Sequence, residues 1–171
     1  VALSMQYTNS WDIDINFLEN QLQNLANNWI KTVLVAWTTW ESSSMSINEQ
    51  ITYVRIASNL ALKYWISIIA GAGSNSTSEQ NELITWVLWG NFTEDKTQTS
   101  QVENINLENS KTVATLLLPP YYVKTSNENL IRHLTEWLNR WPAIIYSIKW
   151  RTWMEIPLEV LEILSGHANF L

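Results

Sequence analysis

The sequence predicts an α/β protein in which parallel strands alternate with helices. Short apolar runs rich in β-branched residues alternate with longer runs whose apolar residues recur near helical spacing. The short runs are continuously apolar, as buried parallel strands are. Parallel strands need a long crossover connection, which is usually a helix. The order strand, helix, strand therefore predicts parallel pairing, with helices covering the sheet.

Each predicted strand is a short run that ends at a turn signal. Pro119 and Pro120, for example, stop the run 112–118, because proline cannot continue a strand ladder. The predicted strands are 1–5, 32–36, 66–70, 112–118 and 143–148.

The predicted helices carry recognisable start and stop residues. Ser46, with Gln50 nearby, is a fitting cap region, and Ser126 or Asn127 caps a later helix. Pro142 ends that helix, and Gly166 follows the last one. The predicted helices are 16–28, 46–64, 126–141 and 156–166, and the loop 71–80 leads into a further helix start.

About five strand–helix units result, in one domain over residues 1–171. Their periodicity leaves two architectures open, an open doubly wound sheet and part of a (β/α)8 barrel. The stretch 91–111 is polar with few apolar anchors, so we expect an insertion loop or a disordered excursion there.

Composition excludes several function classes. The net charge of −6 and the pI of about 4.9 argue against a nucleic-acid binder. The chain has no cysteine, which excludes disulfides and thiolate metal sites and fits a cytoplasmic protein. His133 and His167 lack the spacing of metal ligands. No secretion signal is evident, and no apolar run reaches the roughly 18 residues of a membrane helix.

Polar side chains follow the predicted strands, where parallel α/β folds bind ligands. Hydroxyl groups and one arginine dominate this set, which suits proton relay and carboxylate binding. The alternatives are helix capping for the threonines, packing for the tyrosine pair and a plain surface charge for the arginine. The set is Thr38, Thr39, Glu41, Ser42, Gly71, Gly73, Ser74, Asn75, Tyr121, Tyr122, Tyr146 and Arg151.

Four segments, taken in order, resemble motifs of the dihydrodipicolinate synthase family. "AWTTWESSSMS" is similar to G-T-T-G-E-S-x-x-L-S, and "IIAGAGSNSTSE" to I-A-G-x-G-x-N-x-T-x-E. "PPYYVKTSNENLIRHL" is similar to T-P-Y-Y-x-K-P-x-x-x-G-L-x-x-H-F, and "PAIIYSIKWRT" to P-x-x-L-Y-N-x-P-x-R-T. The resemblance implies a (β/α)8 barrel, of which this chain encodes about the first five βα units.

The resemblance also implies a class I aldolase that condenses pyruvate with aspartate semialdehyde in lysine biosynthesis. It implies no cofactor and a homotetramer or dimer, while the composition and spacing given above predict no metal, no nucleic-acid partner and no membrane partner. The related N-acetylneuraminate lyases remain an alternative, although the R-T-G-type segment favours the synthase.

Family roles transfer to individual residues here. Thr38, Tyr122 and Tyr146 match the hydroxyl relay, with Tyr122 serving a neighbouring subunit's side of the site. Thr38 and Thr39 match the pyruvate carboxylate site, and Arg151 matches the group that binds the second substrate. The Schiff-base lysine of the family has no counterpart: the chain ends at "SGHANFL", where we expect the strand carrying that lysine to follow. This favours an inactive chain.

Glycine and tryptophan depart from ordinary usage in opposite directions. The chain has 4 glycines, where average usage predicts about 12, and it has 11 tryptophans. Since Gly-to-Trp is a single-base change, one hypothesis is a decayed, non-catalytic copy; the alternative is a selected aromatic core. Six tryptophans stand where the family usually has glycine: Trp11, Trp29, Trp37, Trp40, Trp65 and Trp153.

Overall fold

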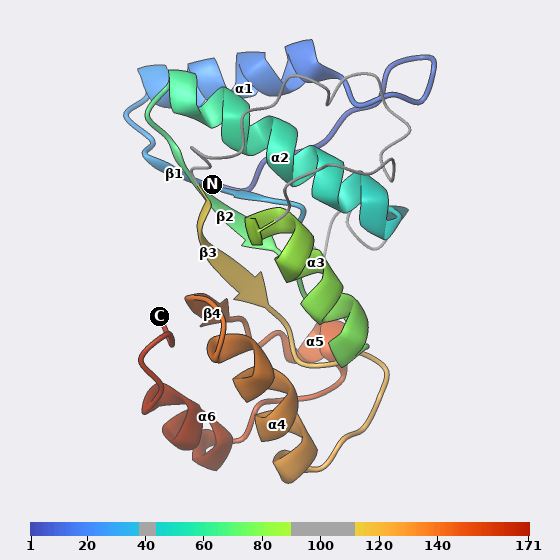
Figure 1. Ribbon diagram of the computed structural model, residues 1–171, viewed down its shortest axis with the longest axis vertical. Coiled ribbons are helices and arrows are strands. Elements are labelled where there is room, and N and C mark those ends of the chain that lie inside the picture. Colours follow the sequence, from blue (N-terminus) through green and yellow to red (C-terminus); the bar gives the residue numbers. More distant parts are fainter. Residues whose placement is uncertain (38–43, 90–111) are drawn as a thin grey trace.

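The computed structural model describes residues 1–37, 44–89 and 112–171, the side chains of 86–89 excepted, and confirms the α/β class. A parallel sheet has the strand order β1-β2-β3-β4, so each strand pairs with the next in the chain (Figure 1). The predicted insertion 91–111 lies outside the described residues and stays a prediction. The strands are β1 Thr32–Val35, β2 Ser67–Gly71, β3 Thr112–Leu117 and β4 Ala143–Ile145.

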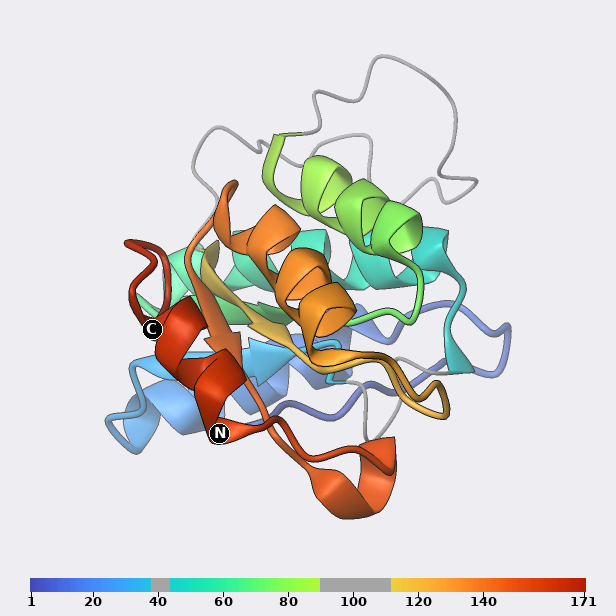
Figure 2. The same cartoon turned by 90° about the horizontal axis from the view of Figure 1, so that it is seen from below.

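Helices connect the strands and pack in succession. Helix α1 lies against α2, α2 against α3, and α4 against α6. Figure 2 shows α2, α3 and α4 on the same side of the sheet. The helices are α1 Ile15–Asn27, α2 Ile47–Lys63, α3 Thr77–Trp89, α4 Asn127–Leu138, α5 Lys149–Thr152 and α6 Leu158–Ser165.

Both edges of the sheet are extended by single bridges. The predicted strand 1–5 is reduced to a parallel bridge between Ala2 and Leu34. At the other edge Phe170 forms a parallel bridge with Ala143, and the Ala143 amide donates to the Asn169 carbonyl (2.9 Å). The expectation that the chain stops before the next strand therefore needs correction: residues 169–171 already lie beside β4.

The core has two parts, one on each half of the sheet. Val33, Ala57 and Ile68 are fully buried in the first, which joins β1 and β2 to α1 and α2. Leu117 and Trp137 are fully buried in the second, which joins β3 and β4 to α4 and α6. Continuous burial along the strands is what parallel sheets require.

Side-chain caps fix where the helices begin. The Ser46 hydroxyl accepts from the Glu49 amide (3.3 Å), and the Glu49 carboxylate accepts from the Ser46 amide (2.7 Å). This capping box satisfies two backbone donors at once, so Glu49 is the partner of Ser46 in place of Gln50. Ser126 caps α4, as predicted, by accepting from the Asn129 amide (3.3 Å).

Four tryptophans lie in the left-handed backbone region. Trp11, Trp29, Trp65 and Trp153 have φ of 65°, 63°, 56° and 59°. Their side chains are 82%, 83%, 76% and 75% exposed. An aromatic core is therefore wrong for these four positions, all of which were matched to family glycines.

Two of them close the ends of the long helices. After α1, the Trp29 amide donates to the Ala26 carbonyl (3.0 Å) and the Ile30 amide to the Leu25 carbonyl (3.0 Å). After α2, Trp65 and Ile66 repeat the same pair of bonds. This is the Schellman motif, whose left-handed residue is usually glycine because a side chain is strained there.

Trp65→Gly is expected to raise the free energy of unfolding, although removing a tryptophan usually destabilises. The left-handed conformation costs a residue with a Cβ roughly 1–2 kcal/mol, and the exposed indole contributes little burial to offset that cost. Urea denaturation measures the change.

Trp150→Gly is the matched control. Trp150 is 77% exposed but lies in helix α5 with ordinary helical backbone, where glycine costs roughly 0.5–1 kcal/mol. If the two substitutions lower the free energy of unfolding by the same amount, the hypothesis of backbone strain at Trp65 is wrong.

A buried histidine joins α3 to α4. The Thr77 hydroxyl and His133 Nδ1 are 2.7 Å apart, and His133 is 7% exposed. Burial lowers the pKa of His133, so the unfolded chain binds this proton more readily than the folded chain does.

Unfolding free energy is therefore expected to fall as pH drops below the ordinary histidine pKa of about 6.5. His133→Gln should flatten this dependence between about pH 7.5 and 5.5, measured by urea denaturation at each pH. A His133→Gln variant whose unfolding free energy keeps the same pH dependence would contradict the assignment.

Candidate active site

The carboxyl ends of β1 and β2 approach each other closely. A Cβ added at Gly71 would lie 2.0 Å from the Ala36 carbonyl oxygen, so only glycine fits at the end of β2. Ala36 itself has a positive φ of 52°, which turns the chain sharply after β1. The next residue, Trp37, is thereby directed over the strand ends.

Trp37 reaches the end of β4. Its ring and the ring of Tyr146 have centroids 4.8 Å apart and planes at 55°. In a flat sheet β1 and β4 would be about 14 Å apart. The sheet is therefore curled, and the two aromatic side chains meet across its carboxyl edge. Tyr146 is half-buried, and its amide donates to the Leu117 carbonyl (2.9 Å).

The loop after β2 is held by its own side chains. The Ser74 hydroxyl donates to Glu79 Oε2 (2.7 Å) and accepts from the Ser76 amide (3.1 Å). Asn75 Oδ1 accepts from the Tyr121 amide (2.6 Å). Asn75 thus fixes where the tyrosine pair leaves β3, a positioning contact that the sequence motif alone did not indicate.

Tyr121 and Tyr122 take different places. Their rings meet edge to face with centroids 6.4 Å apart. Burial, followed by the charge of Glu79, raises the pKa of Tyr121. Tyr122 has φ 64° and is 84% exposed. The strained backbone directs the predicted relay tyrosine outward, away from the chain's own core.

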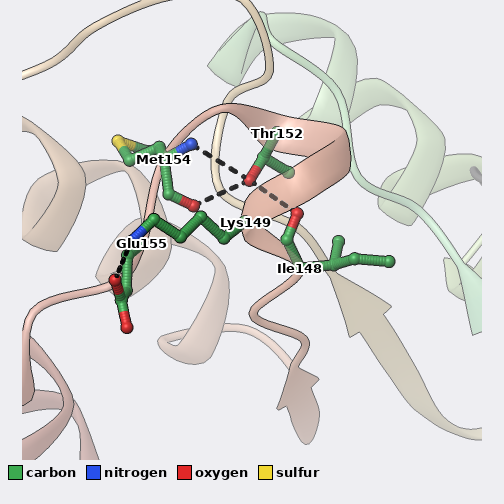
Figure 3. Close-up of polar contacts among 5 residues, drawn as sticks. All are labelled: Ile148, Lys149, Thr152, Met154 and Glu155. Carbon is green, nitrogen blue, oxygen red and sulfur yellow. Dashed lines mark hydrogen bonds and ion pairs between the residues drawn. The ribbon is translucent and has the colours of Figure 1, made fainter.

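Helix α5 follows β4 and carries the predicted arginine; it was not predicted from the sequence. Thr152 Oγ1 lies 3.1 Å from the Ile148 carbonyl and 2.8 Å from the Met154 carbonyl, and it accepts from the Met154 amide (3.4 Å) (Figure 3). Lys149 Nζ contacts Glu155 Oε2 at 2.7 Å, and this hydrogen bond and charge raise the pKa of Lys149. These contacts shape the turn on which Arg151 sits.

Arg151 is exposed on that turn. Within residues 1–37, 44–89 and 112–171, no carboxylate forms an ion pair with it. The planar fork of a guanidinium suits a carboxylate, so carboxylate binding stays the prediction for Arg151.

The predicted site residues therefore fall into four groups. Gly73, Ser74, Asn75 and Tyr121 belong to the loop after β2 and to the contact that joins this loop to the segment after β3. Gly71 and Tyr146 lie at the carboxyl edge of the sheet, where Trp37 joins them. Tyr122 and Arg151 are exposed beyond it. Thr38, Thr39, Glu41 and Ser42 lie outside the described residues, so their roles stay predictions.

A separate pocket of about 480 Å³ lies between α3, α4 and the segment after β3. Thr77 and His133 line it together with Arg132 and Glu136. Tyr146 and Trp37 are not among its lining residues, so it is distinct from the carboxyl edge of β1 and β4. In the described part of the chain, no helix is both long and apolar enough for a membrane span.

Comparison with known sequences gives a consistent set of relatives. The sequence model of the dihydrodipicolinate synthetase family matches residues 1–85 and 95–171. A 4-hydroxy-tetrahydrodipicolinate synthase of Staphylococcus epidermidis is 29% identical over 96% of this chain and 49% of its own length. The chloroplastic 4-hydroxy-tetrahydrodipicolinate synthase 1 of Triticum aestivum is 30% identical over 98% of this chain and 38% of its own length.

Solved structures agree with the sequences. The 4-hydroxy-tetrahydrodipicolinate synthase of Methylacidiphilum fumariolicum matches with a TM-score of 0.77 and 29% identity, over 98% of this chain and 49% of that one. The dihydrodipicolinate synthase of Aquifex aeolicus matches with a TM-score of 0.79 and 26% identity, over 99% of this chain and 51% of that one.

The fold is thus that part of a (β/α)8 barrel that the sequence predicted, and the chain spans about half the length of the curated relatives it matches. With the family sequence model covering nearly all of it, and with these relatives and structures in agreement, the chain belongs to the dihydrodipicolinate synthetase family.

Proposed function

We propose that this chain forms the first half of a pyruvate-condensing site of the 4-hydroxy-tetrahydrodipicolinate synthase type. The observation that carries the proposal is the meeting of the β1 and β4 carboxyl ends, where Tyr146 lies beside residue 37. A relative from Acinetobacter baumannii, similar in fold with a TM-score of 0.79, was solved complexed with pyruvate. Aspartate semialdehyde is the second substrate that the family implies, in lysine biosynthesis.

The chemistry requires an amine and a proton relay. A lysine amine adds to the pyruvate carbonyl, and loss of water from the carbinolamine gives the Schiff base. Protons must move at both stages, which hydroxyl groups within hydrogen-bonding reach perform. We assign this relay to Thr38, Tyr146 and the Tyr122 of a neighbouring subunit in a homodimer or homotetramer.

The carboxylates need their own partners. Backbone amides at Thr38 and Thr39 suit the pyruvate carboxylate, and Arg151 suits that of the second substrate. We assign the Schiff-base lysine to the other half of the barrel. The four described lysines have other places: Lys31 precedes β1, Lys63 ends α2, Lys124 is exposed in the segment after β3, and Lys149 is engaged by Glu155.

A non-catalytic chain is the second candidate, and the packing of Trp37 on Tyr146 favours it. The indole fills space beside the relay hydroxyl where a 2-oxo acid would need to enter. The two candidates differ in whether a Schiff base can form once a lysine is supplied.

Borohydride reduction in the presence of pyruvate tests the source of the lysine. The 171-residue chain alone should give no covalent adduct by mass spectrometry. The same chain joined to the C-terminal half of the Staphylococcus epidermidis relative should give one with Trp37 in place, whereas an adduct that appears only after Trp37→Gly would favour the non-catalytic candidate. An adduct on the chain alone would overturn the assignment of the lysine, and a joined, folded chain without an adduct would favour the non-catalytic candidate.

Tyr146→Phe in that joined chain tests the relay. Loss of the hydroxyl should lower kcat about 100-fold or more, the usual contribution of a positioned proton-transfer group, measured by coupled turnover of pyruvate and aspartate semialdehyde. Tyr64→Phe is the control, because Tyr64 ends helix α2 and bonds Glu19. Equal kcat in the two variants would remove Tyr146 from the relay.

A further inference from the structure

The left-handed positions of this chain have an unusual set of occupants. In residues 1–37, 44–89 and 112–171, positive φ occurs at four tryptophans and at Ala36 and Tyr122. None of the described glycines has a positive φ, although glycine is the residue that this conformation normally selects. Tryptophan thus stands in the conformational role of glycine.

The hydrogen bonds show what these positions do. Trp29 and Trp65 occupy the left-handed site of complete Schellman motifs after α1 and α2. Trp153 is the left-handed cap of α5, and its amide donates to the Lys149 carbonyl (2.8 Å). Trp11 lies in the turn closed by its amide and the Thr8 carbonyl (3.0 Å). All four are backbone turning points.

Burial does not select an indole at these four positions. The four side chains are 75–83% exposed, so burial does not offset the backbone strain. Trp11 has a ring contact with Tyr7, with centroids 6.2 Å apart, and is nevertheless 82% exposed.

Trp137 shows what a tryptophan of the same chain looks like where the fold requires it. Its side chain is fully buried in the second core. Its Nε1 donates to Thr115 Oγ1 at 2.7 Å, so both the ring and its one donor have partners. The described tryptophans therefore include two populations with opposite environments.

Gene decay does not produce this selectivity. Random substitution would damage caps and core at the same rate as turning points. Yet the Ser46–Glu49 capping box is complete, Asp14 caps α1, and buried apolar residues form two continuous clusters. The replacements concentrate on one residue type in one conformational role, which indicates a difference in how a codon is read.

We propose that the cell that makes this protein inserts glycine at positions 11, 29, 65 and 153, from a codon that other genetic codes read as tryptophan. UGA is such a codon, since its meaning differs between genetic codes and it is one base from both GGA and UGG. Trp137, by contrast, comes from UGG and is tryptophan in the protein. The chain then has ordinary Schellman glycines and a glycine content closer to average usage.

This assignment also changes the candidate site. If Trp37 is encoded by the same codon, the indole beside Tyr146 is absent from the natural protein, and the carboxyl edge of the sheet is open. That consequence rests on the proposed function, whereas the assignment of the four positions rests on backbone conformation alone.

Peptide mass spectrometry of the protein purified from its own cells tests the proposal without an activity assay. The tryptic peptide that ends at Lys31 contains Trp11 and Trp29, and peptide 133–140 contains Trp137 as its one tryptophan. We expect the first to be lighter by two Trp-to-Gly differences and the second to have its tryptophan mass. The gene should carry UGA at positions 11 and 29 and UGG at 137.

Two results would overturn the proposal. The first is a peptide ending at Lys31 that has tryptophan mass at positions 11 and 29. The second is UGG at positions 11, 29, 65 and 153, which would return the pattern to substitution in the gene. Either outcome leaves the pyruvate-site proposal standing, since borohydride trapping tests that separately.

Discussion

The fold depends on how each helix ends. In a parallel sheet every helix must stop and return the chain to the next strand within a few residues. Helices α1 and α2 do this by Schellman motifs in which the amides of Ile30 and Ile66 bond back to Leu25 and Ala61. That closure demands a left-handed residue just beyond the helix. The positions 29 and 65 are therefore set by the hydrogen bonds around them, whatever residue occupies them.

The fold class and most elements could be predicted because buried strands are recognisable in the sequence as short apolar runs. The apolar runs of β1, β2 and β3 are indeed buried, as shown by Val33, Val35, Ile68 and Leu117. The prediction failed where tertiary pairing decides length. The run 143–148 keeps ladder geometry only over Ala143–Ile145, and the segment 1–5 has a single bridge. Helix α5 has only four residues and is held by the hydrogen bonds of Thr152. A helix this short has too few residues to show a helical periodicity in the sequence.

The site was partly predictable for a similar reason. Strand ends in a parallel sheet share one edge, so Tyr146 could be placed from order alone. The contact of Trp37 with Tyr146 could not, because it depends on sheet curvature, which arises from twist accumulated over four strands. The outward direction of Tyr122 could not be predicted either, because it follows from a backbone φ of 64° that a sequence motif does not reveal.

Curvature also decides what half a barrel can do. The ring contact across β1 and β4 shows that the sheet is already curled with four strands, and Phe170 lies where the ladder continues beside β4. The geometry of the carboxyl edge is therefore a local property of these strands. Under the proposed function, a Schiff-base lysine reaching that edge from the other half of the barrel would meet the Tyr146 hydroxyl, to which we assign the proton relay. Whether pyruvate fits between them depends on the side chain at position 37, so the codon there decides if this edge is a site or a packed surface.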